Sequence, residues 1–465
     1  MTYLNNHSLG RAALGALTVS AALALTVPGC NFGGLNDNVH QAGDEPGGVD
    51  IASGDIAVAP EGDYFLFERD DHLAVGWTNS TEVQDLPVRF PDRLAFATGR
   101  RVVYVTTRQG SVYAVDVDHA EVAWSTHNVL SRVGDTRIVS SEDDTRVVAG
   151  DGSEVTLLDA ATGTEVAALP VEGLVDLEIL PDDQRVLAVQ SHQWSDDVDP
   201  EPTTEIHVIA LDDGVSRPIE VPNCADDIIV PAHGELALLA PTTCQKDPIS
   251  HIDLTAGEEA FVRNLPGFGP VALGPEGELA VGFLDLNNVD VELFDDPVDV
   301  PESAERYHLM VIDTTDMSYE FHAWGNNLPR YAMTPDGHML LVDEALNEGS
   351  ARLFDLREGV FDVITGPAVT FEHLTFTGDS SHAYLLSDAI FHAQSEEGTW
   401  TDYQLYDLTI GEATVTKLPT DFRPRNLNLA PQSDKLFLRK DASSICVYSL
   451  DTLTCTRSLD LSAAE

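Results

Sequence analysis

The chain has 465 residues and a formal net charge of −53, from 78 acidic and 25 basic residues. The acidic residues occur along the whole chain, so its surface repels phosphate backbones, which excludes nucleic acid as a partner, and it also repels anionic lipid headgroups. The hydrophobic fraction of 43% is enough to build a core, and no apolar run beyond the N-terminal region is long enough to span a membrane.

The basic residues are unusual in type, because only four of the 25 are lysines. This acidic, lysine-poor composition resembles that of proteins from salt-loving organisms, in which high ionic strength screens the repulsion between carboxylates to within a few ångströms. We therefore expect molar salt to raise the melting temperature. Melting curves recorded with and without the salt test this expectation, and equal temperatures would contradict it.

Residues 1–29 have the order of a secretory signal. Arg11 and the amino terminus give a positive start, residues 12–27 form an apolar core, and the small residue Gly29 directly precedes Cys30. The segment resembles a bacterial lipoprotein signal, which implies that Cys30 becomes the lipidated N-terminus. The protein would then be anchored on the extracytoplasmic side of a bacterial membrane, in the periplasm or at the cell surface. The alternative is an ordinary signal peptide followed by a chance cysteine.

Residues 30–50 combine the lipidated cysteine with a segment rich in Gly, Asn and Asp, which predicts a flexible linker. Residues 51–465 contain short apolar runs separated by turn residues, a pattern typical of strands. The sequence therefore predicts one folded domain after the linker.

One strand–turn–strand element recurs along this domain. Its best copy has an apolar strand from Tyr331, the turn Pro335-Asp336-Gly337, and a second strand from Met339. Proline fixes φ and glycine accepts a positive φ, so this turn reverses the chain tightly. Other copies cover residues 56–67, 177–189 and 271–281, and weaker copies lie near Thr98, Ser141, Pro231, Gly378 and Pro431.

A second element follows each copy, consisting of an apolar strand that ends in aspartate, a turn and an outer strand. Aspartate suits this place because its carboxylate accepts backbone N–H groups within a turn. We therefore predict a structural and not a catalytic role for these aspartates, which are Asp116, Asp159, Asp212, Asp253, Asp313, Asp355 and Asp407.

Together the two hairpins form a four-stranded antiparallel sheet, and we count nine candidate units at spacings of about 35 to 60 residues. Such sheets can bury both faces only by packing around an axis. We predict an all-β fold, a single β-propeller. Eight blades are expected and seven to nine are allowed, since one terminal unit could be split to close the ring.

The run from Gly110 to Trp124 resembles the repeat of PQQ-like propellers, which has an apolar strand, Ala-x-Asp, a turn and a final tryptophan that packs between blades. Ala120 stands where that family prefers glycine, whereas the copy at residues 154–165 has the turn glycine, Gly163. Other units resemble tryptophan–aspartate or YVTN-type propeller repeats. The resemblance implies the fold, but not the activity, because propellers host many functions.

Two cysteine pairs each flank a predicted hairpin: Cys224 with Cys244, and Cys446 with Cys455. Since the signal implies an oxidising compartment, we predict two local disulfides. Four reduced, buried thiols are the alternative.

Two acidic insertions, residues 191–205 and 284–306, interrupt the repeats between the predicted second and third strands, which places both on one rim. Insertions that share a rim often mark a binding face. We interpret them as partner-binding loops; solvated acidic loops and a loose calcium site are the alternatives. The candidate residues are Trp194, Asp196, Asp197, Asp199, Asp285, Asp290, Glu292, Asp295 and Asp296.

No motif of this sequence specifies a catalytic reaction, and no cofactor is predicted. Gly267-x-Gly269-x-x-Ala272 loosely matches a dinucleotide-binding motif, but it lies between strands with no helix to receive a phosphate. We expect a non-enzymatic, lipid-anchored scaffold of the cell envelope that binds a protein or polysaccharide. The alternative is an envelope enzyme, a quinoprotein-like oxidoreductase or a hydrolase, with its site at the central channel. Several His, Asp, Glu or Arg side chains converging there would favour the enzyme.

Overall fold

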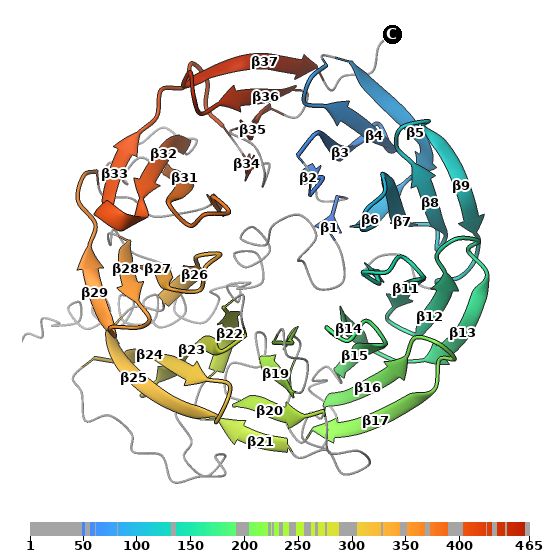
Figure 1. The fold of residues 1–465 in the computed structure, drawn as a ribbon, viewed down its shortest axis with the longest axis horizontal. Coiled ribbons are helices and arrows are strands. Elements are labelled where there is room, and N and C mark those ends of the chain that lie inside the picture. The colour runs from blue at the N-terminus through green and yellow to red at the C-terminus, as the bar shows by residue number, and fades with distance from the viewer. Residues whose placement is uncertain are drawn as a thin grey trace, which may run out of the picture.

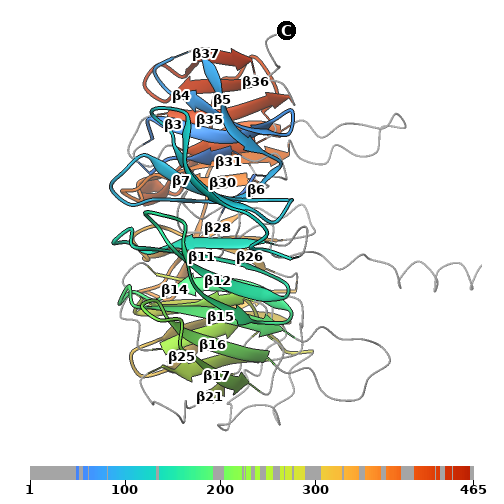
Figure 2. The same ribbon diagram turned by 90° about the vertical axis from the view of Figure 1, so that its right-hand side faces the viewer.

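Nine sheets follow one another along the chain and close into a ring, as the computed structural model shows (Figure 1). Seen from the side, the ring is a disc (Figure 2). The structure describes residues 49–460 except 52–55, 61, 81, 132–135, 192–203, 222–224, 226, 232–235, 241–247, 255–261, 266–267, 275–276, 288–304, 327–328, 345–350, 368–372, 389–402, 425, 430–434 and 442–443.

Each blade has four antiparallel strands, which run from the axis outward in chain order (Figure 1). Blades 1 to 4 contain β2 (Ile56–Val58), β3 (Tyr64–Arg69), β4 (His72–Trp77) and β5 (Val83–Arg89); β6 (Pro91–Phe96), β7 (Val102–Thr107), β8 (Val112–Asp116) and β9 (Glu121–Thr126); β10 (Arg137–Ser140), β11 (Arg146–Asp151), β12 (Glu154–Asp159) and β13 (Glu165–Pro170); and β14 (Leu174–Ile179), β15 (Arg185–Ser191), β16 (Thr204–Ala210) and β17 (Ser216–Val221). Blades 5 to 7 contain β18 (Asp227–Ile229), β19 (Leu236–Ala240), β20 (Ile249–Asp253) and β21 (Val262–Leu265); β22 (Phe268–Leu273), β23 (Leu279–Asp285), β24 (Tyr307–Asp313) and β25 (Ser318–Gly325); and β26 (Pro329–Met333), β27 (Met339–Glu344), β28 (Arg352–Asp355) and β29 (Val360–Val363). Blades 8 and 9 contain β30 (His373–Phe376), β31 (His382–Asp388), β32 (Tyr403–Thr409) and β33 (Thr414–Lys417); and β34 (Asn426–Leu429), β35 (Lys435–Asp441), β36 (Ser444–Ser449) and β37 (Thr454–Asp460).

A short 3-10 helix, η2 (Ile410–Glu412), forms the turn between β32 and β33. Across the residues that the structure describes, no helix combines the length and the apolar character needed to cross a membrane.

The ring has two distinct faces. Because neighbouring strands alternate in direction, the turns between the first and second strands and between the third and fourth strands lie on one face, which we call the turn face. The opposite face, called the loop face, carries the connections between second and third strands and those between blades. The turns of the predicted strand–turn–strand element, which join first and second strands, therefore lie on the turn face.

The predicted aspartates do cap turns on the turn face. Asp159, the last residue of β12, accepts the backbone N–H groups of Ala161 and Thr162 at 3.2 and 2.9 Å, and the Thr162 hydroxyl at 2.8 Å. These hydrogen bonds, led by that from the Thr162 side chain, lower the pKa of the Asp159 carboxyl. Asp355 likewise accepts from the backbone of Arg357 and Glu358. The prediction of a structural role is confirmed at these positions.

The same turns need one residue with positive φ. Gly163 fills this place in blade 3 with φ +69°, and Gly214 in blade 4 with φ +71°. In blade 2 the residue is Ala120, with φ +52°, at the position where PQQ-like repeats prefer glycine. A left-handed conformation strains any residue that carries a Cβ atom.

We expect Ala120→Gly to raise the free energy of unfolding by about 0.5–1 kcal/mol, because glycine removes the left-handed strain. Chemical denaturation followed by circular dichroism measures this change. The matched control is Ala161→Gly in the equivalent turn of blade 3, an exposed position without positive φ, where the substitution should lower stability. Equal effects of the two substitutions would show that the strain at Ala120 is unimportant.

The core is divided into nine apolar clusters, one at every junction between neighbouring blades. At the junction of blades 2 and 3, Trp124 of β9 is buried and its indole N–H donates to the carbonyl oxygen of Ala160 at 2.9 Å. A Cβ atom added to Gly163 would lie 2.4 Å from the Trp124 ring. The tryptophan therefore packs between blades, as predicted.

The expected count of eight blades is corrected to nine in the chain as the structure describes it. The lower count allowed for one terminal unit being split to close the ring, but blade 1 and blade 9 each take all four of their strands from one contiguous stretch. The ring closes through side chains instead. Phe65 of blade 1 contacts Phe437 of blade 9, with ring centroids 4.9 Å apart, inside a shared apolar cluster.

One extra strand lies on the inner side of the ring. β1 (Val49–Asp50) pairs antiparallel with β6, so blade 2 has five strands. Val49 and Ile51 are buried in the cluster between blades 1 and 2. The first described strand thus begins two residues before residue 51, the predicted start of the domain.

Candidate functional site

The loop face differs between the two halves of the ring. In blades 1, 2, 3 and 9 the second and third strands are joined by two to four residues, whereas blades 4 to 8, which are consecutive, have longer connections. The long connections comprise residues 192–203, 241–248, 286–306, 345–351 and 389–402. We call these five connections the arc. The two insertions predicted to share a rim both belong to it, and both start and end on the loop face.

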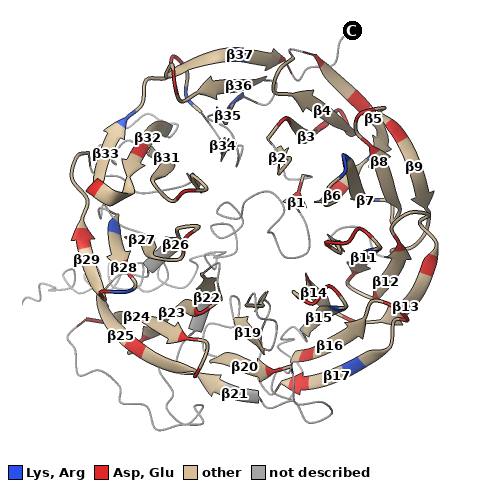
Figure 3. Cartoon of the chain, in the orientation of Figure 1, with Lys and Arg blue, Asp and Glu red and all other residues tan. Residues whose placement is uncertain are grey.

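The arc is acidic by sequence. Residues 192–203, 286–305 and 389–402 contain Asp and Glu but no Lys or Arg. Elsewhere, Asp and Glu occur around the whole ring, while Lys and Arg occupy far fewer positions (Figure 3). Among the predicted partner-binding residues, all except Asp285 lie outside the described residues, namely Trp194, Asp196, Asp197, Asp199, Asp290, Glu292, Asp295 and Asp296.

Asp285 lies at the end of β23, at the base of the longest connection, and is 1% exposed. Arg306 donates to both of its carboxylate oxygens, from Nε at 2.8 Å and from the terminal nitrogen at 2.5 Å. Asp285 also accepts the backbone N–H of Asn287 at 2.9 Å. The hydrogen bond from Arg306 to Asp285 raises the pKa of this guanidinium.

The Asp285–Arg306 pair therefore joins the two ends of the connection. The Arg306 guanidinium also stacks over Tyr307, 4.7 Å from the ring centroid, and the Arg306 backbone N–H donates to the Asn326 side chain at 3.1 Å. Asp285 is thus a bracing residue and not an exposed contact of the loop. Sequence analysis missed Arg306, although it is the only Lys or Arg between Arg263 and Arg330, which is a signal that could have identified it.

Buried aspartates gather toward the same face. Asp92 accepts from the Thr136 hydroxyl at 2.5 Å, and Asp151 accepts from the backbone N–H of Ser153 at 2.8 Å. Five aspartates among the described residues are buried, with less than a tenth of their surface exposed: Asp92, Asp151, Asp176, Asp285 and Asp343. All of them lie on the first or second strand of a blade, in the half of the strand nearer the loop face.

Charged residues on the innermost strands link successive blades. Arg137 of blade 3 donates from Nε to the carbonyl oxygen of Val175 in blade 4 at 2.9 Å. Asp176 of blade 4 accepts the backbone N–H of Leu177 at 2.8 Å and that of Ile228 in blade 5 at 3.3 Å. Arg137 and Asp176 together therefore connect three blades near the axis.

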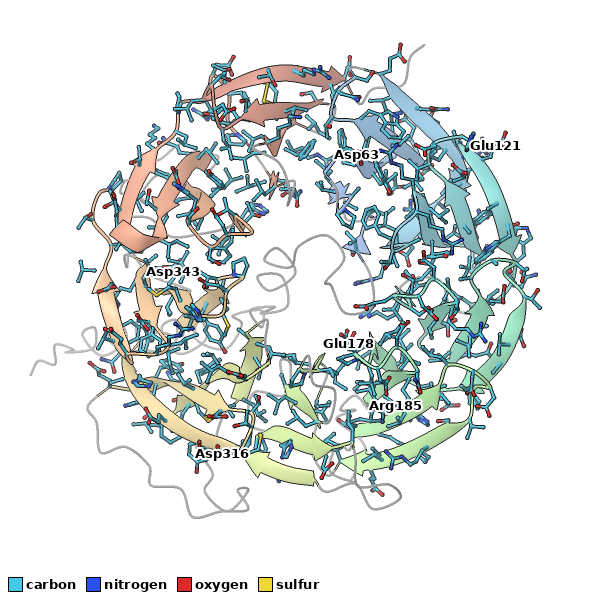
Figure 4. All side chains as sticks on the ribbon, viewed as in Figure 1. Asp63, Glu121, Glu178, Arg185, Asp316 and Asp343 are labelled. Carbon is cyan, nitrogen blue, oxygen red and sulfur yellow. A yellow bond between two sulfur atoms is a disulfide. The ribbon has the colours of Figure 1, made fainter. Side chains whose placement is uncertain are left out.

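Burial raises the pKa of Asp176 to about 6, while Arg137 and Arg93 act in the opposite direction. Carboxyl groups with a pKa shifted in this way occur in active sites as well as in structural networks of ion pairs and hydrogen bonds. In Figure 4, Glu178 of the same strand lies toward the axis, whereas Glu121 and Asp316 lie on the outer side of the ring.

We expect the raised pKa of Asp176 to make stability depend on pH. In the unfolded chain this carboxyl ionises near pH 4, but in the folded protein near pH 6. Stability should therefore fall by about 3 kcal/mol as the pH rises from 4 to above 6, because ionisation of the buried group is unfavourable. Asp176→Asn removes this dependence, so its stability relative to the wild type should increase from pH 4 to pH 7. Urea denaturation at a series of pH values measures the difference, and a difference independent of pH would contradict the assignment.

A serine–histidine pair on blade 2 lacks the carboxylate of a catalytic triad. Ser111 Oγ lies 3.1 Å from Nδ1 of His127, but Nε2 of this histidine lies 3.4 Å from Ser125 Oγ, where a catalytic triad has a carboxylate. No group of three or more His, Cys, Asp or Glu side chains in the described part of the chain could hold a metal ion.

The structure brings one predicted cysteine pair together. Cys446 of β36 and Cys455 of β37 have Cα atoms 5.7 Å apart, and their sulfur atoms are 2.29 Å apart, at disulfide-bonding distance. Cys224 and Cys244, like the predicted lipidation site Cys30, lie outside the described residues.

No protein-family model and no curated protein sequence matches this chain. Among solved structures, a eukaryotic initiation factor superposes with a TM-score of 0.53 at 12% identity, over 75% of this chain and 82% of that one. The dihydro-heme d1 dehydrogenase NirN superposes with a TM-score of 0.48 at 16% identity, over 77% and 73% of the two chains. The β-propeller domain of Cps50 (Swd1) from Myceliophteria thermophila gives 0.39 at 11% identity, over 77% and 93%. At these identities the likeness concerns the fold alone. The nine four-stranded units closed into a ring make the chain a β-propeller.

Proposed function

We propose that this protein is a non-enzymatic, lipid-anchored propeller of the bacterial cell envelope, and that the arc of long connections on its loop face binds a protein or a glycan. The observation that carries the binding role is the concentration of these connections on five consecutive blades of one face. A rigid ring that presents variable loops on one side is a common arrangement for recognition.

The acidic arc favours a partner with basic or strongly hydrogen-bonding groups, since carboxylates attract cations and accept hydrogen bonds. The Asp285–Arg306 pair supports the binding role because it fixes both ends of one loop, which reduces the entropy lost when the loop binds. The anchor at Cys30 is supported by the order of charged start, apolar core and small residue before the cysteine.

The binding role can be tested by capture from membranes. The full chain, a variant with residues 288–304 replaced by a short Gly-Ser linker and a control Glu165→Gln on the outer strand β13 would be used as baits. We expect one partner to be retained by the full chain and the control, and lost by the variant, with all three proteins equally stable. A partner that the loop variant retains would contradict the proposal.

The anchor has a separate test, because it does not depend on the loops. Cys30→Ala should abolish incorporation of a labelled fatty acid and release the protein from the membrane fraction. A membrane-bound, unlabelled wild type would contradict lipidation at this residue.

An envelope enzyme with its site at the axis is the second candidate. It is favoured by the charged residues on the inner strands, above all Asp176 with its raised pKa beside Arg137. Absorption spectra and elemental analysis of the purified protein would reveal a bound cofactor or metal. Turnover that Asp176→Asn abolishes while the fold is retained would replace the scaffold proposal with this one.

A further inference from the structure

The last strand, β37, contributes to the junction between blades 9 and 1. Leu459 of β37 is buried in the apolar cluster that joins the two blades. Arg457, also on β37, donates to the backbone carbonyl oxygen of Thr78 in blade 1 at 3.1 Å. No strand is shared across this junction in the described chain, so β37 helps to close the ring together with Phe437 of β35 and the residues of β36 in the same cluster.

β37 is itself held from one side. It is the outermost strand of its blade and pairs with β36, with an irregularity in register between Val447 and Tyr448. Cys446 and Cys455 connect these two strands at that irregularity, since Tyr448 is the partner of Cys455. Cys446 and Cys455 both lie in the apolar cluster between blades 8 and 9, where Cys446 is buried and Cys455 is part-exposed. The exposed part of Cys455 gives a reductant access to the bond.

We propose that the Cys446–Cys455 disulfide is a redox-sensitive lock on the closure of the ring. A dithiol reductant would open it by thiolate attack on Sγ of Cys455, which releases Cys446 as a thiolate that takes up a proton. The second thiol of the reductant then displaces Cys455, which is also protonated, and leaves the reductant as a disulfide. Afterwards β37 is held by hydrogen bonds and packing alone, so Leu459 and Arg457 separate from blade 1 more often.

Hydrogen exchange of the full-length mature protein tests the lock. Mass measurement after alkylation first establishes whether Cys446 and Cys455 form a disulfide, because bonded cysteines are not alkylated. Free thiols in the protein isolated without reductant would overturn the proposal. With the bond present, dithiothreitol should speed amide exchange about tenfold or more in β37 and also in β2 and β3 across the junction. Exchange in β19 and β20, on the opposite side of the ring (Figure 1), should stay unchanged.

Two variants distinguish a disulfide that stabilises the junction with blade 1 from one that stabilises only the β36–β37 hairpin. The double variant Cys446→Ser and Cys455→Ser should exchange quickly at both places, with or without dithiothreitol. Leu459→Ala should speed exchange in β2 and β3 while the disulfide is intact. If reduction changes exchange only within β36 and β37, and blade 1 remains as protected as before, the bond is a staple of its own hairpin and the proposal is wrong.

Discussion

Replacement of Trp124 by alanine should lower the free energy of unfolding by about 3–5 kcal/mol, the largest effect we expect from any single substitution. The indole fills the junction between blades 2 and 3, where it contacts Gly163 and donates to Ala160. Alanine would leave a cavity there and an unsatisfied carbonyl oxygen. Urea denaturation followed by circular dichroism measures the loss.

Two further substitutions test the same contact from both sides. Trp124→Phe keeps most of the apolar contact but loses the indole N–H, so it should cost less than alanine. Gly163→Ala should also destabilise, because its Cβ atom would collide with the Trp124 ring and because its φ of +69° disfavours alanine. A loss below about 1 kcal/mol for Trp124→Ala would mean that the junction repacks freely.

Asp285→Ala should cost about 3 kcal/mol, because it leaves the Arg306 guanidinium and the Asn287 N–H without their shared acceptor. This figure is at the lower end for a broken buried pair, since 36% of the Arg306 side chain is exposed. The substitution should also speed cleavage within residues 288–304 by a glutamate-specific protease. Thermal denaturation and limited proteolysis measure the two effects.

A double-mutant cycle provides the control for this pair. Asp285→Ala combined with Arg306→Ala should cost less than the sum of the single substitutions, because neither partner is then left alone. Arg306→Lys should be intermediate, since lysine cannot form the two parallel hydrogen bonds. Additive losses, with unchanged proteolysis, would contradict a role for the pair in bracing the loop.

The strands and turns were predictable because they depend on neighbouring residues. The turn at Pro335-Asp336-Gly337 and the capping aspartate Asp159 are local signals, and both have the predicted place in the blades. Nine units were counted in the sequence, but how the two end units close the ring, and hence the number of blades, was not predictable in this way. It depends on contacts such as Phe65 with Phe437, between residues at opposite ends of the chain.

The site was predictable in position but not in detail. The long acidic segments indicated one rim, and the strands place the ends of these segments on one face. The pairing of Asp285 with Arg306, and the hydrogen bond from Arg137 to the Val175 carbonyl, were missed. The first lies within one blade, but its partners are 21 residues apart in the sequence. The second depends on which blades become neighbours, and it uses a backbone acceptor that leaves no trace in the residue types.

Apart from β1, which is added to blade 2, the strands of each of the nine blades come from one uninterrupted stretch of polypeptide. The ring could therefore be cut at a different place, with its original ends joined, and still present the same set of modules. A circular permutant that begins at β14 would place new termini between blades 3 and 4 and seal the present junction covalently. The same modularity would let gene duplication enlarge or shrink the ring by whole blades without disturbing the sheets that remain.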